Sequence, residues 1–109
     1  MVEVPGFALK VTENGHGPVV LLSGELDLGA ASQFRECLQQ FSDETVTLDF
    51  TDVTFLDSSA IGVLVGARNR ADEAGGAIVL HGVQPAQMRI FEITGLTEHL
   101  NFDGDGTAE

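Results

Sequence analysis

Strand-like and helix-like spacings of apolar residues alternate along this chain, and this alternation constrains the fold more than any other feature. Large apolar residues occupy every second position from Phe7 to Val11 and from Val46 to Phe50, which is the period of a β-strand. They recur at helical spacing from Ala30 to Phe41 and again from Asp57 to Gly75. Strands that alternate with helices predict a largely parallel sheet covered by helices.

Turn and cap residues place the remaining elements. The turn residues Asn14-Gly15-His16-Gly17 before the apolar run Val19–Leu22 predict a hairpin, so the first two strands are expected to be antiparallel neighbours. A short strand is predicted at Ala77–Leu80, a helix from Pro85 to a cap at Gly95, and an edge strand at His99–Phe102. The chain is therefore predicted to be an α/β domain. Its mixed, mostly parallel sheet has four to five strands, an opening β-hairpin and three to four covering helices.

Length and charge limit what this domain binds. The 109 residues fit one domain, predicted to span residues 1–102, while residues 103–109 are acidic and Gly-rich and are predicted to form a flexible tail. Seventeen acidic residues against five basic ones give a formal charge of −12. This charge disfavours nucleic acid and direct membrane binding, because both need clusters of Lys and Arg. It favours a neutral or basic protein partner.

Cysteine usage and the N-terminal residues indicate the compartment. Cys37 is the only cysteine, so no internal disulfide forms, and its place on an apolar helical stripe favours a small buried hydrophobe over a reactive thiol. The N-terminal residues lack the basic region and apolar run of a signal peptide, and no long uncharged apolar run occurs. We therefore expect a cytoplasmic protein.

The residues Asp57-Ser58-Ser59 lie where a strand gives way to the next helix, at the sheet edge where α/β domains carry their sites. Any of the three side chains suits a helix cap that accepts hydrogen bonds from the first N–H groups, and capping is the structural alternative to a functional site. A serine hydrolase is disfavoured, since the G-x-S-x-G elbow is absent and the three histidines lie in separate segments.

Two acidic groups have the composition of metal sites. Asp49, Asp52 and Asp57 resemble the Mg²⁺ site of a phosphotransfer domain. The only lysine is Lys10, on the opening strand, so caps, loop acceptors or surface charge are the favoured roles. Residues 101–106 match the first half of a calcium loop, whose twelfth position, a bidentate Glu, falls beyond residue 109. Neither a metal nor a cofactor is expected.

Three stretches carry a family resemblance. Residues 49–64, D-F-T-D-V-T-F-L-D-S-S-A-I-G-V-L, closely resemble the signature of STAS domains of the anti-sigma factor antagonist family. S-G-E-L-D at residues 23–27 is similar to a second landmark of that family, and Gly95-Leu96 after a helix led by Pro85 is similar to a third. The similarity spans nearly the whole chain. Many members have Gly where this chain has Ala60, a small departure that leaves the motif intact.

The resemblance implies a bacterial partner-switching protein that is not an enzyme. In the family, the serine after the aspartate, here Ser58, is phosphorylated by an anti-sigma factor that is also an ATP-dependent serine kinase. The unmodified protein captures the anti-sigma factor and frees the sigma factor, and a metal-dependent serine phosphatase returns the phosphorylated form to this state. The alternative is a STAS subunit that docks on a membrane lipid-transport ABC complex, with no regulated phosphate.

A docking surface is expected around the serine. A phosphate on Ser58 would face the N–H groups and the positive dipole end of the helix, and its charge would repel a partner. The residues expected to contact that partner are Asp57, Ser59, Ala60, Gly62, Val63, Glu25 and Asp27. Glu25 and Asp27 are expected in the loop after the second strand, where Asp27 is equally well placed to cap the first helix.

Overall fold

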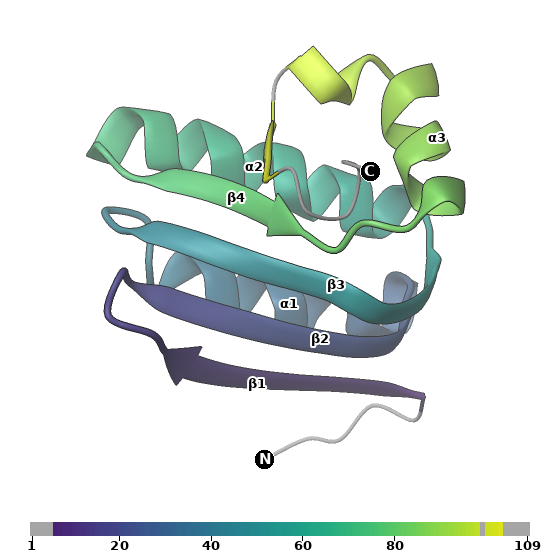
Figure 1. The fold of residues 1–109 in the computed structure, drawn as a ribbon, viewed down its shortest axis with the longest axis horizontal. Coiled ribbons are helices and arrows are strands. Elements are labelled where there is room, and N and C mark those ends of the chain that lie inside the picture. Colours follow the sequence, from purple (N-terminus) through teal and green to yellow (C-terminus); the bar gives the residue numbers. More distant parts are fainter. Residues whose placement is uncertain (1–5, 99, 104–109) are drawn as a thin grey trace.

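A five-stranded mixed sheet supports the helices of this protein (Figure 1). The structure, a computed structural model, describes residues 6–98 and 100–103. Its elements are β1 (Phe7–Glu13), β2 (Pro18–Leu26), α1 (Leu28–Gln39), β3 (Thr45–Leu56), α2 (Ser58–Ala74), β4 (Ala77–His81), α3 (Pro85–Ile93), a 3₁₀ helix (Leu96–Glu98) and β5 (Asn101–Phe102). The strands lie in the order β1-β2-β3-β4-β5, and every neighbouring pair except β1 and β2 is parallel. The predicted α/β class, mixed sheet and opening hairpin are confirmed.

The hairpin forms where its turn residues predict it. The Asn14 side chain accepts a hydrogen bond from the backbone N–H of His16 (2.9 Å). Gly15 and Gly17 have φ values of 91° and 122°, a region that residues with a side chain rarely adopt. β1 and β2 therefore pair antiparallel along the whole of β1.

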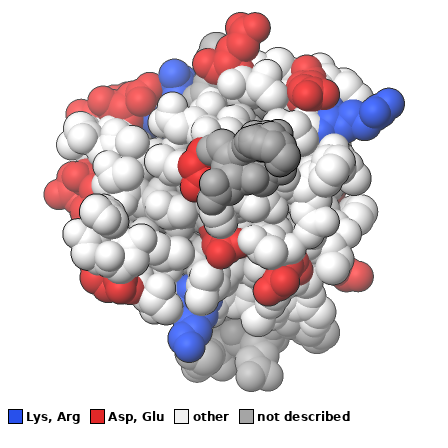
Figure 2. Space-filling model, in the orientation of Figure 1, with Lys and Arg blue, Asp and Glu red and all other residues white. Residues whose placement is uncertain are grey.

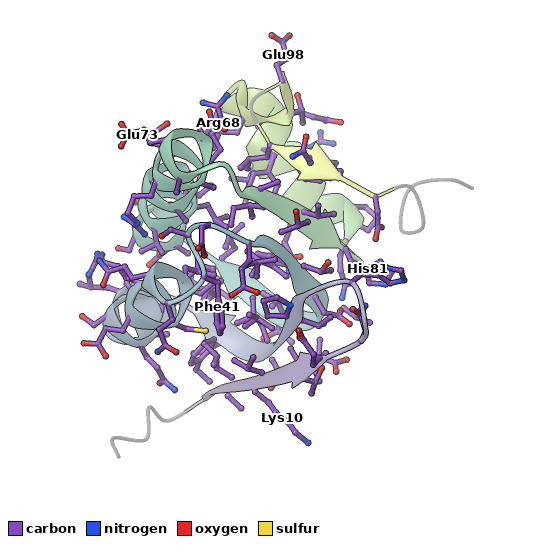
Figure 3. The ribbon with its side chains drawn as sticks, turned by 90° about the vertical axis from the view of Figure 1, so that its left-hand side faces the viewer. Lys10, Phe41, Arg68, Glu73, His81 and Glu98 are labelled. Carbon is purple, nitrogen blue, oxygen red and sulfur yellow. The ribbon has the colours of Figure 1, made fainter. Side chains whose placement is uncertain are left out.

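Among the described residues, α1 and α2 cover one face of the sheet and leave the other face, here called the open face, without a covering helix. Figure 3 shows α1 and α2 on one side of the strands and the side chain of His81 on the other. Alternate residues of the three central strands are buried on the covered face: Val20, Leu22, Val46, Leu48, Ile78 and Leu80. They form one core cluster with Phe34 of α1 and Leu64 of α2. The open face carries the residues of opposite parity, among them Asp49 and His81, which are register partners.

The two covering helices follow the predicted spacing and differ only at their ends. α1 begins two residues before Ala30 and ends before Phe41. Its Cys37 is buried, and burial raises the pKa of the thiol. α2 ends at Ala74, and the next residue, Gly75, has a φ of 87° that suits a helix cap. No helix within the described residues has the length and apolar character needed to cross a membrane.

β3 is longer than predicted, because two irregularities hide its second half from the pattern. Its pairing with β2 shifts between Leu21 and Ser23 and again between Gly24 and Glu25, and β3 has one extra residue at each place. The spacing of its buried residues therefore changes from two to three: Val46, Leu48, Phe50, Val53 and Leu56. The second shift leaves Phe55 on the surface with half of its area exposed.

Side chains of α3 take the place of a strand along the second half of β3. β4 pairs with β3 only over Thr45–Asp49, so that side of β3 has no strand neighbour farther along. The side-chain amide of Gln84, the N-cap of α3, donates to the carbonyl of Thr51, and that of Gln87 donates to the carbonyl of Val53 (2.7 Å). Gln87 is the single buried polar residue in the described part of the chain. α3 is thereby tied to the strand that leads to Ser58.

The C-terminal strand is shorter than predicted. β5 has two residues, and His99, where the strand was expected to begin, lies outside the described residues. Phe102 packs edge-on against a phenylalanine of α3, with ring centroids 5.5 Å apart. Of the predicted flexible tail only Asp103 is described, and its carboxylate lies 2.8 Å from Nδ1 of His81. The rest of the tail, residues 104–109, falls outside the described residues.

Candidate functional site

Two strand-to-helix junctions lie side by side at the carboxyl end of the sheet. β2 ends at Leu26 and β3 ends at Leu56, and these two residues are register partners. Each is followed by an aspartate, Asp27 or Asp57, that is the N-cap of the next helix. The sequence Leu-Asp is therefore used twice, in adjacent parallel strands, to start a helix at the same edge.

Both aspartates cap their helices through one carboxylate oxygen. Oδ1 of Asp27 accepts a hydrogen bond from the N–H of Ala30 (3.3 Å). Oδ1 of Asp57 accepts from the N–H groups of Ser59 (2.9 Å) and Ala60 (3.2 Å). The sequence left three candidates for the cap of α2, and in the structure the cap is Asp57.

The second oxygen of Asp57 reaches the neighbouring helix. Oδ2 accepts a hydrogen bond from the N–H of Leu28 (3.1 Å), the first residue of α1. One carboxylate thus serves the first turns of both helices, whose N–H groups carry the partial positive charge of the helix dipoles. Asp57 fastens the two junctions together.

Ser58 is the first residue of α2, and its side chain is exposed. An exposed hydroxyl at this place is accessible to a modifying enzyme. The carboxylate of Asp57 already accepts hydrogen bonds from the N–H groups of Ser59 and Ala60. A phosphate on Ser58 would therefore stand beside a like charge, in addition to facing a helix N-terminus as the sequence suggested.

The predicted docking residues of α2 are divided between surface and core. Gly62 is exposed and Ser59 is partly buried. Ala60 and Val63 are 0% and 4% exposed, so the expectation that their side chains lie on a docking surface is wrong. The reason is helical phase, because both residues belong to the stripe that α2 turns toward the sheet, together with Leu64.

The two acidic docking candidates differ from their predicted placement. Glu25 is exposed, but it lies within β2 and not in the loop that follows. It is the register partner of Phe55 in β3. Asp27 is partly buried and caps α1. Contact of either carboxylate with a partner stays a prediction.

Two exposed apolar side chains at these junctions were missed by the sequence reasoning. Leu28 is 74% exposed and Phe55 is 50% exposed. Leu28 holds in α1 the position that Ser58 holds in α2, since each directly follows the capping aspartate. Only weak signals marked them: Leu28 precedes the buried stripe that starts at Ala30, and Phe55 lies where the alternation of β3 fails.

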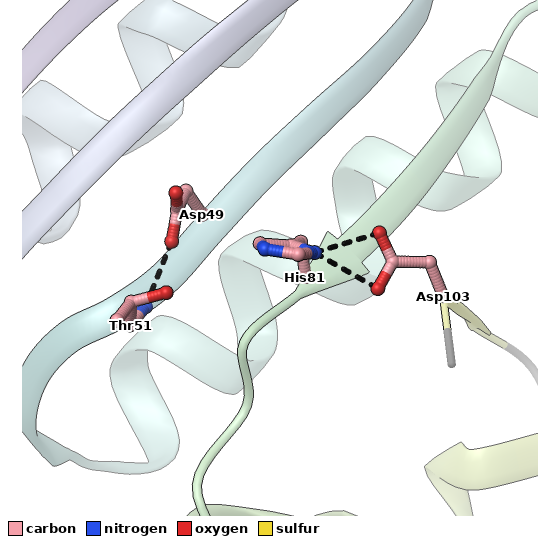
Figure 4. A network of polar contacts seen from close by, with 4 residues as sticks. All are labelled: Asp49, Thr51, His81 and Asp103. Atoms are coloured by element: carbon pink, nitrogen blue, oxygen red, sulfur yellow. Dashed lines mark hydrogen bonds and ion pairs between the residues drawn. The ribbon is translucent and has the colours of Figure 1, made fainter. Parts of the chain in front are cut away.

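The aspartates with the composition of a Mg²⁺ site are spread along β3 and its end. Asp49 and Asp52 lie within the strand, and Asp49 accepts a hydrogen bond from the backbone N–H two residues later (2.9 Å). Figure 4 shows Asp49 beside His81 on the open face, with His81 bonded to Asp103. In the described ranges, no three His, Cys, Asp or Glu side chains are grouped to hold a metal ion. Half of the candidate calcium loop lies outside those ranges.

The charge around the junctions is acidic. Residues 23–31 and 53–63, which form the two junctions, contain Glu25, Asp27 and Asp57 and no Lys or Arg. Figure 2 shows the face seen in Figure 1, on which Asp and Glu side chains lie at many separate places and Lys and Arg at few. This surface suits a neutral or basic partner.

Comparisons with known proteins place this geometry in a family. The profile of the family described as "Mlab, STAS domain" matches residues 9–101, and this match defines the class, a STAS domain. The anti-sigma-B factor antagonist of Listeria monocytogenes is 32% identical over 82 residues, 72% of this chain and 72% of its own. That of Bacillus subtilis is 31% identical over 92 residues, 83% of this chain and 84% of its own. The chain belongs to the anti-sigma factor antagonist family of STAS domain proteins.

Solved structures share the fold. The anti-sigma factor antagonist SpoIIAA in its unphosphorylated form has a TM-score of 0.74 to this chain, at 24% identity, covering 93% of this chain and 92% of that one. The Bacillus SpoIIAA in its phosphorylated form has a TM-score of 0.70, at 24% identity, covering 93% and 96%. At this identity the likeness establishes the common fold.

Proposed function

We propose that this chain is an anti-sigma factor antagonist that binds an anti-sigma factor serine kinase and is released when Ser58 is phosphorylated. The observation that carries the proposal is the exposed Ser58 hydroxyl at the start of α2. In this role the chain is a substrate and a ligand, not a catalyst. Its second partner is a metal-dependent serine phosphatase that removes the phosphate, and it acts in the cytoplasm on sigma-factor-dependent transcription.

The electrostatics of the junction supply a reason for release. A phosphoserine carries about −1.5 to −2 charges, and at Ser58 it would stand next to the carboxylate of Asp57. A partner that closes over this edge would have to desolvate both groups. Each 1.4 kcal/mol lost weakens binding tenfold, so a penalty of about 3 kcal/mol raises Kd by roughly two orders of magnitude.

The exposed position of Ser58 also allows phosphorylation without a change in the fold. The Ser58 side chain lies on the surface, so the modification displaces no core residue. Ser58 is the first residue of α2, so a phosphate on its side chain would lie at the positive end of the helix dipole. The modified domain is therefore expected to keep its fold and to lose a partner.

The test is phosphorylation in a purified system. Incubation with each candidate anti-sigma factor kinase from the same genome and ATP, followed by intact mass measurement and peptide mapping, should find one phosphate, on Ser58. The Ser58→Ala variant should accept none, and the Ser59→Ala variant, altered at the neighbouring hydroxyl, should still be modified. A phosphate on Ser59 alone would contradict the assignment.

Binding provides the second half of the test. The unmodified chain should bind the kinase, and both the phosphorylated chain and a Ser58→Asp variant should bind it at least tenfold more weakly. Equal affinity of the modified and unmodified forms would overturn the switching mechanism, whatever the site of phosphorylation.

A second candidate function is docking on a membrane lipid-transport ABC complex. The observation that keeps it open is the matching family profile, because its description, "Mlab, STAS domain", does not name an antagonist. In that case the same edge would form a constitutive interface with no regulated phosphate. Stable co-purification with an ATPase subunit, together with no phosphate on Ser58 after incubation with the kinases, would favour this role.

A further inference from the structure

Leu28 and Phe55 are exposed apolar side chains that do not belong to the hydrophobic core. Leu28 is 74% exposed at the first position of α1, and Phe55 is 50% exposed near the end of β3. The described residues include five large apolar side chains that are exposed: Val11, Leu21, Leu28, Phe55 and Ile93. Two of the five therefore lie at the paired strand-to-helix junctions.

Leu28 and Phe55 belong to the two junctions that are joined by Asp57, the residue before the acceptor serine. The N–H of Leu28 lies 3.1 Å from Oδ2 of Asp57, and Ser58 is the next residue after Asp57. Phe55 precedes Ser58 by three residues and is the register partner of Glu25 in β2. Leu28 thus belongs to one junction, and Phe55 and Ser58 belong to the other.

The surroundings of these apolar side chains define the partner that fits them. Residues 23–31 and 53–63 contribute three carboxylates, of Glu25, Asp27 and Asp57, and no basic side chain. A complementary surface has an apolar pocket for Leu28 and Phe55 and Lys or Arg residues at its rim. An acidic or uniformly polar partner surface does not match this pattern.

We propose that Leu28 and Phe55 are the apolar anchors of the interface with the anti-sigma factor, which receives them in a pocket rimmed by basic side chains. This inference rests on the proposed function and names the residues that carry its affinity. Ser58 lies in the ring of polar residues that the partner dehydrates around the anchors. The phosphate acts by keeping this ring hydrated, so that the pocket no longer closes over Leu28.

The test compares exposed apolar residues at two places on the surface. Leu28→Ala shortens the anchor without loss of helix propensity, and the control is Ile93→Ala in the last turn of α3, where the side chain is 79% exposed. The probe is the purified kinase that phosphorylates Ser58, with Kd measured by calorimetry. Full burial of a leucine corresponds to roughly tenfold to hundredfold in affinity. Leu28→Ala should therefore raise Kd at least tenfold, and Ile93→Ala should leave it within twofold.

Two further measurements separate an anchor from a general loss of structure. The thermal midpoint of Leu28→Ala should equal that of the wild type, and Phe55→Thr, which keeps β propensity, should weaken binding in the same direction. In a Ser58→Asp background, Leu28→Ala should change Kd much less than in the wild type, because the pocket is already open. Raising the salt concentration should weaken binding of the wild type, since the rim is charged.

The outcomes distinguish this inference from the function on which it rests. If Ser58→Asp weakens binding but Leu28→Ala does not, the antagonist function stands and the anchor assignment is overturned. Equal losses in Leu28→Ala and Ile93→Ala would also overturn it, because they would show a nonspecific apolar effect. If no anti-sigma factor kinase binds or modifies the chain, the proposed function fails and the anchors fail with it.

Discussion

Replacing Asp57 with alanine should destabilise the domain more than removing an ordinary helix cap. The Asp57 carboxylate accepts three hydrogen bonds, from the N–H groups of Ser59, Ala60 and Leu28. Loss of a capping side chain costs about 1 kcal/mol, and the charge-assisted bond to the first turn of α1 adds about 1.5 kcal/mol. The expected loss in the free energy of unfolding is therefore about 2.5 kcal/mol.

The matched control is Asp27→Ala, because Asp27 occupies the equivalent place in β2 and accepts one capping bond (3.3 Å). Its expected cost is about 1 kcal/mol. Asp57→Asn should fall between the two, since it keeps a capping oxygen and loses the charge and one acceptor.

The assay is urea unfolding at neutral pH, followed by circular dichroism, with the midpoint and the slope m compared among the three variants. An unchanged m shows that the denatured states are comparable. If Asp57→Ala costs no more than Asp27→Ala, then the bond from Leu28 contributes nothing and the description of Asp57 as a link between two helices is wrong.

Three other predictions concern parts of the structure away from the serine. Gln87→Leu leaves the carbonyl of Val53 without its side-chain partner in the core and should cost about 1–3 kcal/mol in urea unfolding, whereas an unchanged midpoint would show that the contact is dispensable. Because burial raises the pKa of the Cys37 thiol, iodoacetamide at mildly alkaline pH should label the folded chain far more slowly than the urea-unfolded chain. Equal labelling rates would contradict burial. Gly82 has a φ of 72° and its missing Cβ would meet Thr51, so Gly82→Ala should cost about 1–3 kcal/mol, and a fully stable variant would refute the strain.

The order of elements could be predicted from the sequence because most of them have a regular period. The stripe from Ala30 to Cys37 and the alternation from Val46 to Phe50 each report one buried face. The second half of β3 could not be predicted in this way, since its buried residues are three apart and imitate a helix or a loop. Gln84 and Gln87, at the start of α3, border this part of β3 and leave no pattern in the sequence. Only the structure shows that their side chains donate hydrogen bonds to the strand.

The sequence predicted only part of the geometry of the candidate site. The motif around Ser58 indicated the junction of β3 and α2, but the adjacent junction depends on the register of Leu26 with Leu56, which are 30 positions apart in the chain. No local pattern reports that pairing, so the bond from Leu28 to Asp57 was missed. Ala60 and Val63 were misplaced for a simpler reason, since proximity to the serine was considered without the phase of the helix.

The short reach of β4 has a practical consequence for protein engineering. β4 pairs with the first half of β3, over Thr45–Asp49, and β5 pairs with β4, whereas Ser58 follows the second half of β3. Affinity tags, fluorescent domains or surface tethers fused behind β5 are attached to the part of the sheet that does not position the serine. A fusion behind β5 is therefore expected to leave the serine accessible in binding measurements.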